Sequence, residues 1–194
     1  MSAEAIFRVT QALRGRLQQA LTAAGDPGSV FVGALNDPDA QGASLVLFLY
    51  RIAPNASLRN SEHRVPSNNP PPPVIAYRDS LPMDLYYLVT VGTRAGVGDE
   101  PLLRVLGYAM QSLQGEPDLA GAAVAHETVH VSLEPLSTEE TSRVWSLFPT
   151  ANFRTSVAYL ASPVWIAPLQ PPLPAEPVRQ DELQAGSEPA RSLA

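Results

Sequence analysis

The sequence of 194 residues contains no cysteine and no lysine, and it has only three histidines. Without cysteine, the chain can form no disulfide, no thiolate metal site and no cysteine nucleophile. Its apolar runs are much shorter than the roughly 18 residues that a membrane span needs. The first residues show no basic patch followed by an apolar core, which a signal peptide requires. We therefore expect a cytoplasmic protein that does not enter a membrane.

The charge balance is acidic, with a formal net charge of −6. A protein that neutralises phosphates needs a basic face, so the balance argues against nucleic acid as a partner. All 13 cationic residues are arginine. A GC-rich genome explains this bias, but the planar guanidinium also suits protein interfaces and bidentate pairing with carboxylates.

The hydrophobic pattern predicts an α/β (α+β) fold with a single mixed β-sheet flanked by helices. We expect helices at residues 2–24, 100–113 and 137–148, and strands at 30–35, 44–52, 83–91, 128–133 and 153–166. The order is therefore α-β-β-β-α-β-α-β. The first two strands are spaced to form a hairpin. The last strand is apolar on both faces, as a central strand needs.

The third helix has the clearest start signal. Ser137 followed by Glu140 forms a capping box, and Leu136 can staple the cap to the next turn. Val144, Leu147 and Phe148 should then share one buried helical face. Trp145, like Trp165, is expected to anchor a core or an interface rather than a cofactor.

Two segments are rich in proline and divide the chain. Residues 54–82 hold seven prolines, four of them consecutive at 70–73, and should form an extended surface arm with few ladder hydrogen bonds. Residues 168–194 hold six prolines and should be a flexible tail. We therefore expect one domain at residues 1–167 and a tail at 168–194.

One motif resembles a zinc site. His126, Glu127 and His130 fit the H-E-x-x-H pattern, in which two histidines bind zinc and the glutamate is the general base. That chemistry requires a helix, because only there do positions i and i+4 converge on one metal. Here the motif runs into an alternating Thr-Val-His-Val-Ser-Leu segment, and on a strand the histidines would lie about 13 Å apart. We therefore expect a solvent-facing strand and no bound metal.

Other signals for chemistry are weaker. The glycine-rich residues 92–98 lack the spacing of a phosphate-binding loop or a dinucleotide fingerprint. Asn36, Asp37 and Asp39 could bind a cation, but Asn-Asp-Pro-Asp is ordinary turn chemistry. No serine lies in a nucleophile elbow. We expect neither catalytic residues nor a cofactor.

Several segments, in this order, resemble a known family. They are residues 51–60, residues 85–90, residues 106–113, and residues 136–146, which read Leu-Ser-Thr-Glu-Glu-Thr-Ser-Arg-Val-Trp-Ser and are followed by Arg154, Ser156 and Tyr159. Together they resemble the cap, or tail-terminator, family of extracellular contractile injection systems. These are phage-tail-like particles of the anti-feeding-prophage and Photorhabdus-virulence-cassette type. The loop between residues 115 and 128 looks shorter than in that family, and the tail 168–194 has no counterpart.

The resemblance implies a structural protein that is not an enzyme. Members form a hexameric ring on the distal end of the inner tube and sheath and stop their polymerisation. The expected partners are copies of the chain itself and the sheath and tube proteins, within a particle assembled in the cytoplasm and released on lysis. Asn55, Arg59 and Asn60, where the arm leaves the sheet, and Arg143 on the third helix are the expected contact residues.

Two other functions stay open at this point. The first is a peptide-binding adaptor, whose proline-rich arm or tail docks on an aromatic groove of a partner. The second is a zinc-dependent hydrolase built on His126, Glu127 and His130.

Overall fold

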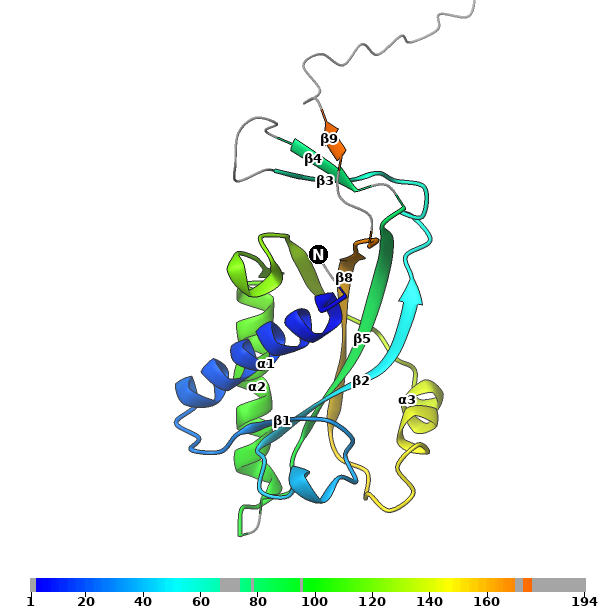
Figure 1. The fold of residues 1–194 in the computed structure, drawn as a ribbon. Helices are drawn as coiled ribbons and strands as arrows, with labels where there is room; N and C mark the ends of the chain where they lie inside the picture. Colours follow the sequence, from blue (N-terminus) through cyan, green and yellow to red (C-terminus); the bar gives the residue numbers. More distant parts are fainter. Residues whose placement is uncertain (1–2, 67–73, 78, 95, 170–172, 176–194) are drawn as a thin grey trace, which may run out of the picture.

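The centre of the molecule is a six-stranded mixed sheet with the strand order β1-β2-β5-β8-β7-β6 (Figure 1). The computed structural model describes residues 3–66, 74–77, 79–94, 96–169 and 173–175. The six strands are β1 (Val30–Val32), β2 (Leu45–Pro54), β5 (Leu81–Val91), β6 (Asp118–Leu119), β7 (Val129–Leu133) and β8 (Ser156–Ile166). The prediction of a mixed sheet flanked by helices is confirmed, and β8 lies in the interior of the sheet as its sequence indicates.

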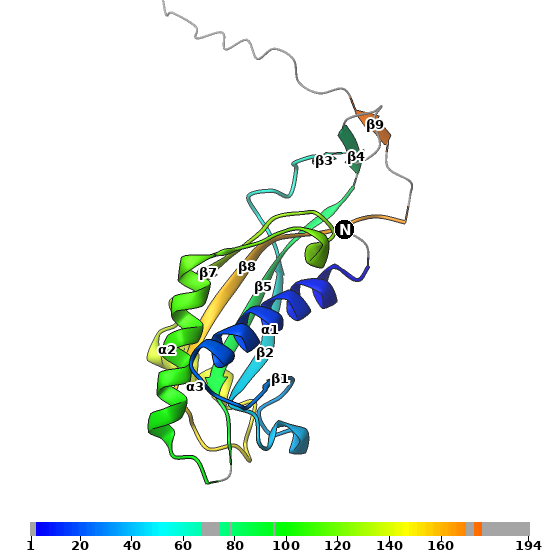
Figure 2. The ribbon, with the colours of Figure 1, turned by 90° about the vertical axis from the view of Figure 1, so that its left-hand side faces the viewer.

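Helices α1 (Ala5–Ala23) and α2 (Asp99–Gly115) cover one face of this sheet and pack against each other (Figure 2). Their apolar faces bury Leu13 and Leu17 from α1 and Leu102 from α2. The phenol of Tyr87 lies fully buried in the same core, where its oxygen is 2.8 Å from Thr10 Oγ1. Both helices occupy the positions that the hydrophobic periodicity predicts.

Helix α3 (Thr138–Trp145) lies on the opposite side of the sheet (Figures 1 and 2). Its capping box is confirmed, because Glu140 N–H donates to Ser137 Oγ while Ser137 N–H donates to the Glu140 carboxylate. The helix is shorter than predicted. Because the chain turns after Trp145, the helical period no longer applies, and Leu147 is 60% exposed rather than buried.

The pairing of the first two strands differs from the predicted hairpin. β1 runs parallel to β2, with Val30 opposite Leu45. Parallel neighbours need a crossover of about a dozen residues, and residues 33–44 supply it through the short helix η1 (Pro38–Ala40). Asp37 caps η1 by accepting a hydrogen bond from Asp39 N–H at 2.9 Å, so this aspartate serves the turn.

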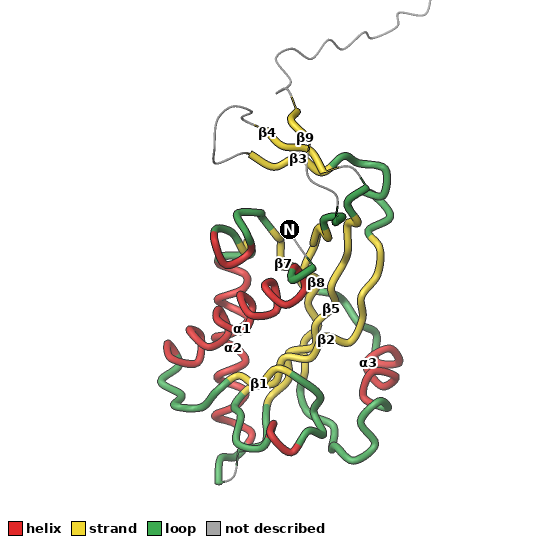
Figure 3. Tube along the Cα trace, in the orientation of Figure 1, coloured by secondary structure: helices red, strands yellow, loops and turns green. Residues whose placement is uncertain are grey.

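A second, smaller sheet stands beyond one end of the main sheet (Figure 3). It consists of β3 (His63–Pro66), β4 (Val74–Tyr77) and β9 (Leu173–Ala175), in the antiparallel order β3-β4-β9. The sequence predicts a single sheet, so this second sheet is a correction. β3 and β4 pair in a ladder within the predicted arm, and β9 lies in the segment predicted to be a flexible tail. The four consecutive prolines at 70–73 and most of the tail, 176–194, lie outside the described residues.

Candidate assembly surface

Asn55 holds the start of the arm against the main sheet. Its Nδ2 donates to Asp84 Oδ1 at 2.9 Å and to Ser162 Oγ at 3.1 Å, and its Oδ1 accepts from Leu58 N–H at 3.0 Å. Ser162 Oγ in turn donates to Asp84 Oδ1 at 2.6 Å. The side chain of Asn55 therefore ties together strands β2, β5 and β8. Its expected contact with a partner stays a prediction, and it would compete with these internal bonds.

Arg59 and Asn60 lie in the turn that follows Asn55, and both are exposed. Arg59 forms no ion pair with any residue in the described part of the chain. A guanidinium in this position can bind a carboxylate of another subunit without first breaking a bond. The structure thus separates the three predicted arm residues into one structural side chain and two outward-facing ones.

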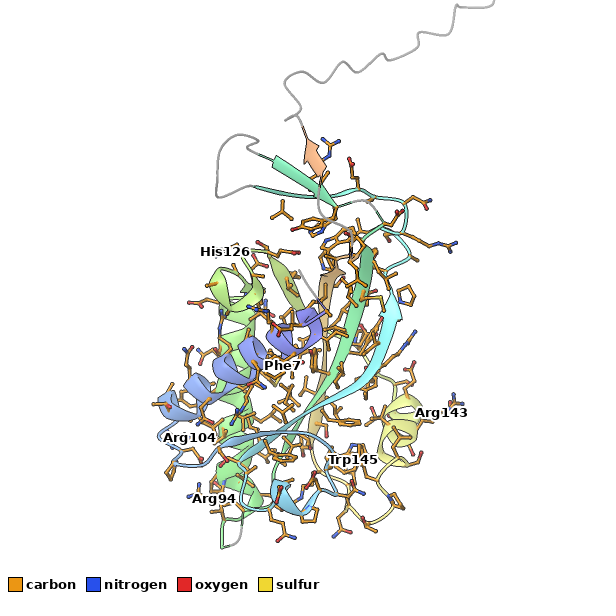
Figure 4. All side chains as sticks on the ribbon, viewed as in Figure 1. Phe7, Arg94, Arg104, His126, Arg143 and Trp145 are labelled. Atoms are coloured by element: carbon orange, nitrogen blue, oxygen red, sulfur yellow. The ribbon has the colours of Figure 1, made fainter. Side chains whose placement is uncertain are left out.

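Arg143 lies on the outer side of α3 and points away from the sheet (Figure 4). Its Nη2 donates to Glu139 Oε1 at 2.6 Å, and the two side chains are 76% and 74% exposed. An exposed pair at i, i+4 contributes only about 0.3–0.5 kcal/mol to stability. Arg143 is therefore accessible, and little stability would be lost if it turned to a partner.

Aromatic rings gather at the C-terminal end of α3, and they include both buried and exposed side chains. Trp145 and Phe148 are buried, and the ring of Phe148 meets that of Phe48 edge-on at 4.9 Å. Phe153 packs on Trp145 at 5.1 Å but is 68% exposed. A groove of about 650 Å³ runs between α3 and Phe153. The sequence does not indicate this groove, because Phe153 begins an apolar run that predicts a buried strand.

The outer face of the main sheet carries tyrosine and arginine next to α3. The rings of Tyr50 and Tyr86 are 6.1 Å apart, and the guanidinium of Arg51 lies 4.8 Å from the centre of the Tyr86 ring. Partial burial, followed by the charge of Glu134, raises the pKa of Tyr50 to about 12, so its phenol stays a hydrogen-bond donor at neutral pH. Tyrosine and arginine are enriched in the residues that dominate binding energy at protein interfaces.

A third surface lies on the far side of α1. Phe7 is 64% exposed there (Figure 4), and a groove of about 830 Å³ separates α1 from the turn at residues 119–123. The floor of the groove consists of small side chains, including Ala12, Gly15 and Ala122. The chain thus has differently shaped surfaces on its two sides.

The residues of the zinc-like motif do not converge. His126 precedes β7 in a left-handed conformation with φ of 64°. His130 lies on β7, where its Nδ1 is 2.7 Å from Asp118 Oδ1. The motif therefore lacks the helix that its chemistry requires, and the strand predicted for His130 is confirmed. Among the described residues, no three histidine or acidic side chains gather in the manner of a metal site.

Glu127 has a structural partner that the sequence did not indicate. Its carboxylate is 3.2 Å from His63 Nε2, and both side chains are 6% exposed. Burial acts to raise the pKa of Glu127, but hydrogen bonds, foremost that with His63, outweigh burial and hold the pKa below its usual value. The imidazole of His63 lies between the rings of Trp165 and Tyr77. This cluster fastens the small sheet to the body.

The sequence as a whole matches a model of the Pvc16 N-terminal domain over residues 8–180. The chain belongs to the Pvc16 N-terminal domain family. This membership confirms the resemblance that the ordered motifs indicated. No curated protein matches the chain. No helix in the described part of this family member is long and apolar enough to cross a membrane.

Two solved structures share the fold of this Pvc16 N-terminal domain. One is the PVC sheath/tube terminator of an extracellular contractile injection system in the extended state, seen by cryo-EM. It is 18% identical with a TM-score of 0.59, and the match covers 96% of this chain and 65% of that one. The other is the tube-terminating cap of the anti-feeding prophage, 17% identical with a TM-score of 0.56, covering 88% and 59%. The chain thus spans less than two thirds of either protein.

Proposed function

We propose that this chain is the structural cap, or tail terminator, of a phage-tail-like contractile injection system. In this role it lies on the distal end of the tube and sheath and ends their polymerisation. The observation that carries the proposal is the fold, which matches a sheath/tube terminator over 96% of the chain, within a family whose model spans residues 8–180. The protein acts by binding other subunits and is not an enzyme.

The ring is proposed to contain six copies. A closed ring uses heterologous contacts, so each subunit must offer two different patches to its neighbours. The α1 groove with Phe7 lies on one side of the sheet, while the α3 groove and the Tyr50–Arg51–Tyr86 face lie on the other. These surfaces differ in shape and chemistry, as a head-to-tail contact requires. Arg59, Asn60 and Arg143 supply polar contacts at their margins.

The sheath and inner-tube proteins are the proposed partners beyond the ring. The particle would assemble in the cytoplasm and leave the cell on lysis. Nucleic acid is not among the proposed partners, because the net charge of −6 opposes phosphate binding.

Deleting the gene in the producing cell tests the function. Electron micrographs should then show sheath and tube polymers of uncontrolled length, and a plasmid copy should restore the normal length. Light scattering on the purified chain, with the tube protein added, should show a ring of six subunits that binds tube ends. Particles of normal length in the deletion strain, together with a chain that stays monomeric in the presence of tube and sheath, would refute the proposal.

A further inference from the structure

The main-chain groups at the β1 edge of the main sheet point outward at two residues, Val30 and Val32. In a parallel pair, alternate residues of a strand bond to its neighbour. Ser29 O accepts from Ser44 N–H, and Gly33 N–H donates to Leu47 O, so the odd positions face β2. The even positions, Val30 and Val32, lie between them, and their N–H and C=O therefore point away from β2. An unprotected pair of this kind is a template for a further strand.

Both groups of Val30 are already bonded by side chains of α1. Val30 N–H donates to Gln18 Oε1 at 3.0 Å, and Arg14 Nε donates to Val30 O at 3.1 Å. The other end of the Gln18 amide is also fixed, because its Nε2 donates to Gly28 O at 3.1 Å. β1 has only three residues and begins at Val30, so Val32 is its one other outward-facing residue. A strand arriving at this edge would have to displace both side chains.

The opposite edge, at β6, is also contacted by a side chain of α1, here at its carbonyls. Val131 N–H donates to Pro117 O, so the carbonyls of Glu116 and Asp118 on either side point outward. The guanidinium of Arg16 donates to Glu116 O through Nη1 and lies 3.5 Å from Asp118 O through Nη2. Its Nη1 is also 3.2 Å from the Glu116 carboxylate, and the side chain is only 17% exposed. One arginine thus bridges two outward carbonyls.

One helix reaches both edges because of its position in the fold. α1 contacts β1, β6 and β8, which places it across the hollow of the sheet (Figure 2). Arg14 and Gln18 are one helical turn apart and point to the same side, while Arg16 lies about 200° around the helix from Arg14. Arg14 and Gln18 therefore extend from one side of α1 toward β1, and Arg16 extends from the other side toward β6.

We propose that α1 obstructs strand addition at both edges of the main sheet, through Arg14 and Gln18 at Val30 of β1 and through Arg16 at β6. The excluded partner is an extended segment of another subunit that would join the sheet by main-chain hydrogen bonds, the mode known as β-augmentation. This protection of the sheet edges extends the proposed function, and its significance for a tail end rests on that function. A subunit that ends a polymer must bind on one side while offering no template for the next subunit.

The Arg14→Met, Gln18→Met double variant tests the β1 edge. Methionine keeps most of the side-chain volume but provides neither the donor nor the acceptor. The control is Arg104→Met with Gln111→Met, which removes the same two residue types from exposed positions of α2, outside the α1 groove and without touching a strand. Sedimentation velocity should show assemblies that grow with concentration for the test variant, while the control and the wild type keep one common mass distribution.

Hydrogen exchange at Val30 reports on the edge directly. At low concentration, the Val30 amide of the test variant should exchange about ten-fold faster than in the control, because its acceptor is gone. At high concentration the protection should return, as the added strand replaces Gln18. A folded variant with the wild-type mass distribution at every concentration would overturn the proposal.

A separate variant keeps the test decisive if the double variant does not fold. Arg16→Met opens only the β6 edge and leaves Val30 bonded. If the double variant loses its circular dichroism spectrum, growth of assemblies by folded Arg16→Met still supports edge closure, and an unchanged distribution contradicts it. Particle length separates this inference from the proposed function. If the variants self-associate but the deletion strain makes particles of normal length, edge protection by α1 stands and the cap function is rejected. If the variants do not self-associate but the deletion strain makes polymers of uncontrolled length, the cap function stands and edge protection is rejected.

Discussion

The imidazole of His63 lies parallel to the indole of Trp165, with ring centres 4.5 Å apart and planes inclined by 7°. His63 begins β3 and Trp165 lies near the end of β8, so this stack joins the small sheet to the main one. Tyr77 covers the other side of the imidazole at 5.5 Å, and Glu127 bonds its edge. The attachment of the small sheet depends on these four side chains.

Replacing Trp165 should loosen that attachment. Trp165→Ala removes a side chain that is only 8% exposed, and truncations of this kind cost about 3–5 kcal/mol. Amide exchange should accelerate in β3 and β4 far more than in α1 or α2. Trp165→Phe keeps a ring for stacking and should lose clearly less stability. Equal acceleration throughout the chain would show that Trp165 supports the whole fold rather than this junction.

Acid should destabilise the protein through Glu127. Because the pKa of its carboxyl is lower in the folded than in the unfolded chain, its contribution to stability is complete above about pH 4.5. That contribution is lost as the pH falls from there through the lower folded pKa. In the Glu127→Gln variant, the free energy of unfolding measured with urea should vary less with pH in this window. Glu139→Gln, on the exposed face of α3, serves as the control and should follow the wild type.

The buried hydroxyls of Thr10 and Tyr87 should be coupled. Thr10 Oγ1 donates to Ile6 O at 2.7 Å, so Tyr87 must be the donor in their 2.8 Å contact. Thr10→Val removes the acceptor in a fully buried site and should cost about 1–3 kcal/mol. Tyr87→Phe in the same background removes the stranded donor, so the double variant should lose less than the sum of the single losses. Additive losses in a double-mutant cycle would argue against the bond.

Truncations should locate the structural part of the tail. Removing residues 168–194 deletes β9 and leaves β4 without its partner on that side. Removing only residues 176–194 keeps β9. Amide protection of β4 should therefore fall in the longer deletion and stay unchanged in the shorter one. Unchanged protection in both would mean that β9 contributes nothing to the small sheet. Retained assembly with a lost partner in the shorter deletion would favour the adaptor function.

Substitutions of the predicted contact residues should fall into two classes, one that lowers stability and one that weakens binding. Asn55→Ala breaks bonds to Asp84, Ser162 and Leu58 and should lower the melting temperature, with a loss of about 1–3 kcal/mol. Arg59→Ala should leave the melting temperature unchanged and weaken binding to tube or sheath ends. Arg143→Ala should behave like Arg59→Ala. A binding defect in Asn55→Ala at full stability would reassign that residue to the interface.

Segments with strong local signals could be predicted from the sequence. The spacing of Leu13 and Leu17 fixed α1, and Ser137 with Glu140 fixed the start of α3. The run from residue 153 to 166 indicated a central strand because both of its faces are apolar. The family resemblance rested on such segments taken in order, and the match to the family over residues 8–180 confirms it.

Features that depend on distant partners could not be predicted. The residues of β1 are apolar whether the strand pairs in parallel or antiparallel, so the hairpin interpretation was wrong. His63 and Glu127 were each read alone, as part of an arm and of a zinc-like motif, because nothing local marks their bond. Arg14, Arg16 and Gln18 are polar positions that flank the apolar stripe of α1 on its two sides, where such residues usually face solvent. Only the curvature of the sheet brings strand edges to them.

The place of α1 in the chain also bears on when the protein can fold. α1 leaves the ribosome before the strands against which it packs, and these include β6 and β8, about 100 and 140 residues later in the chain. Contacts of such long sequence separation form slowly, since a large loop must close before they are gained. The newly made helix therefore keeps Leu13 and Leu17 unshielded until β8 has been synthesised. Nascent chains stalled before residue 156 should recruit chaperones, and chains stalled well after residue 166 should not.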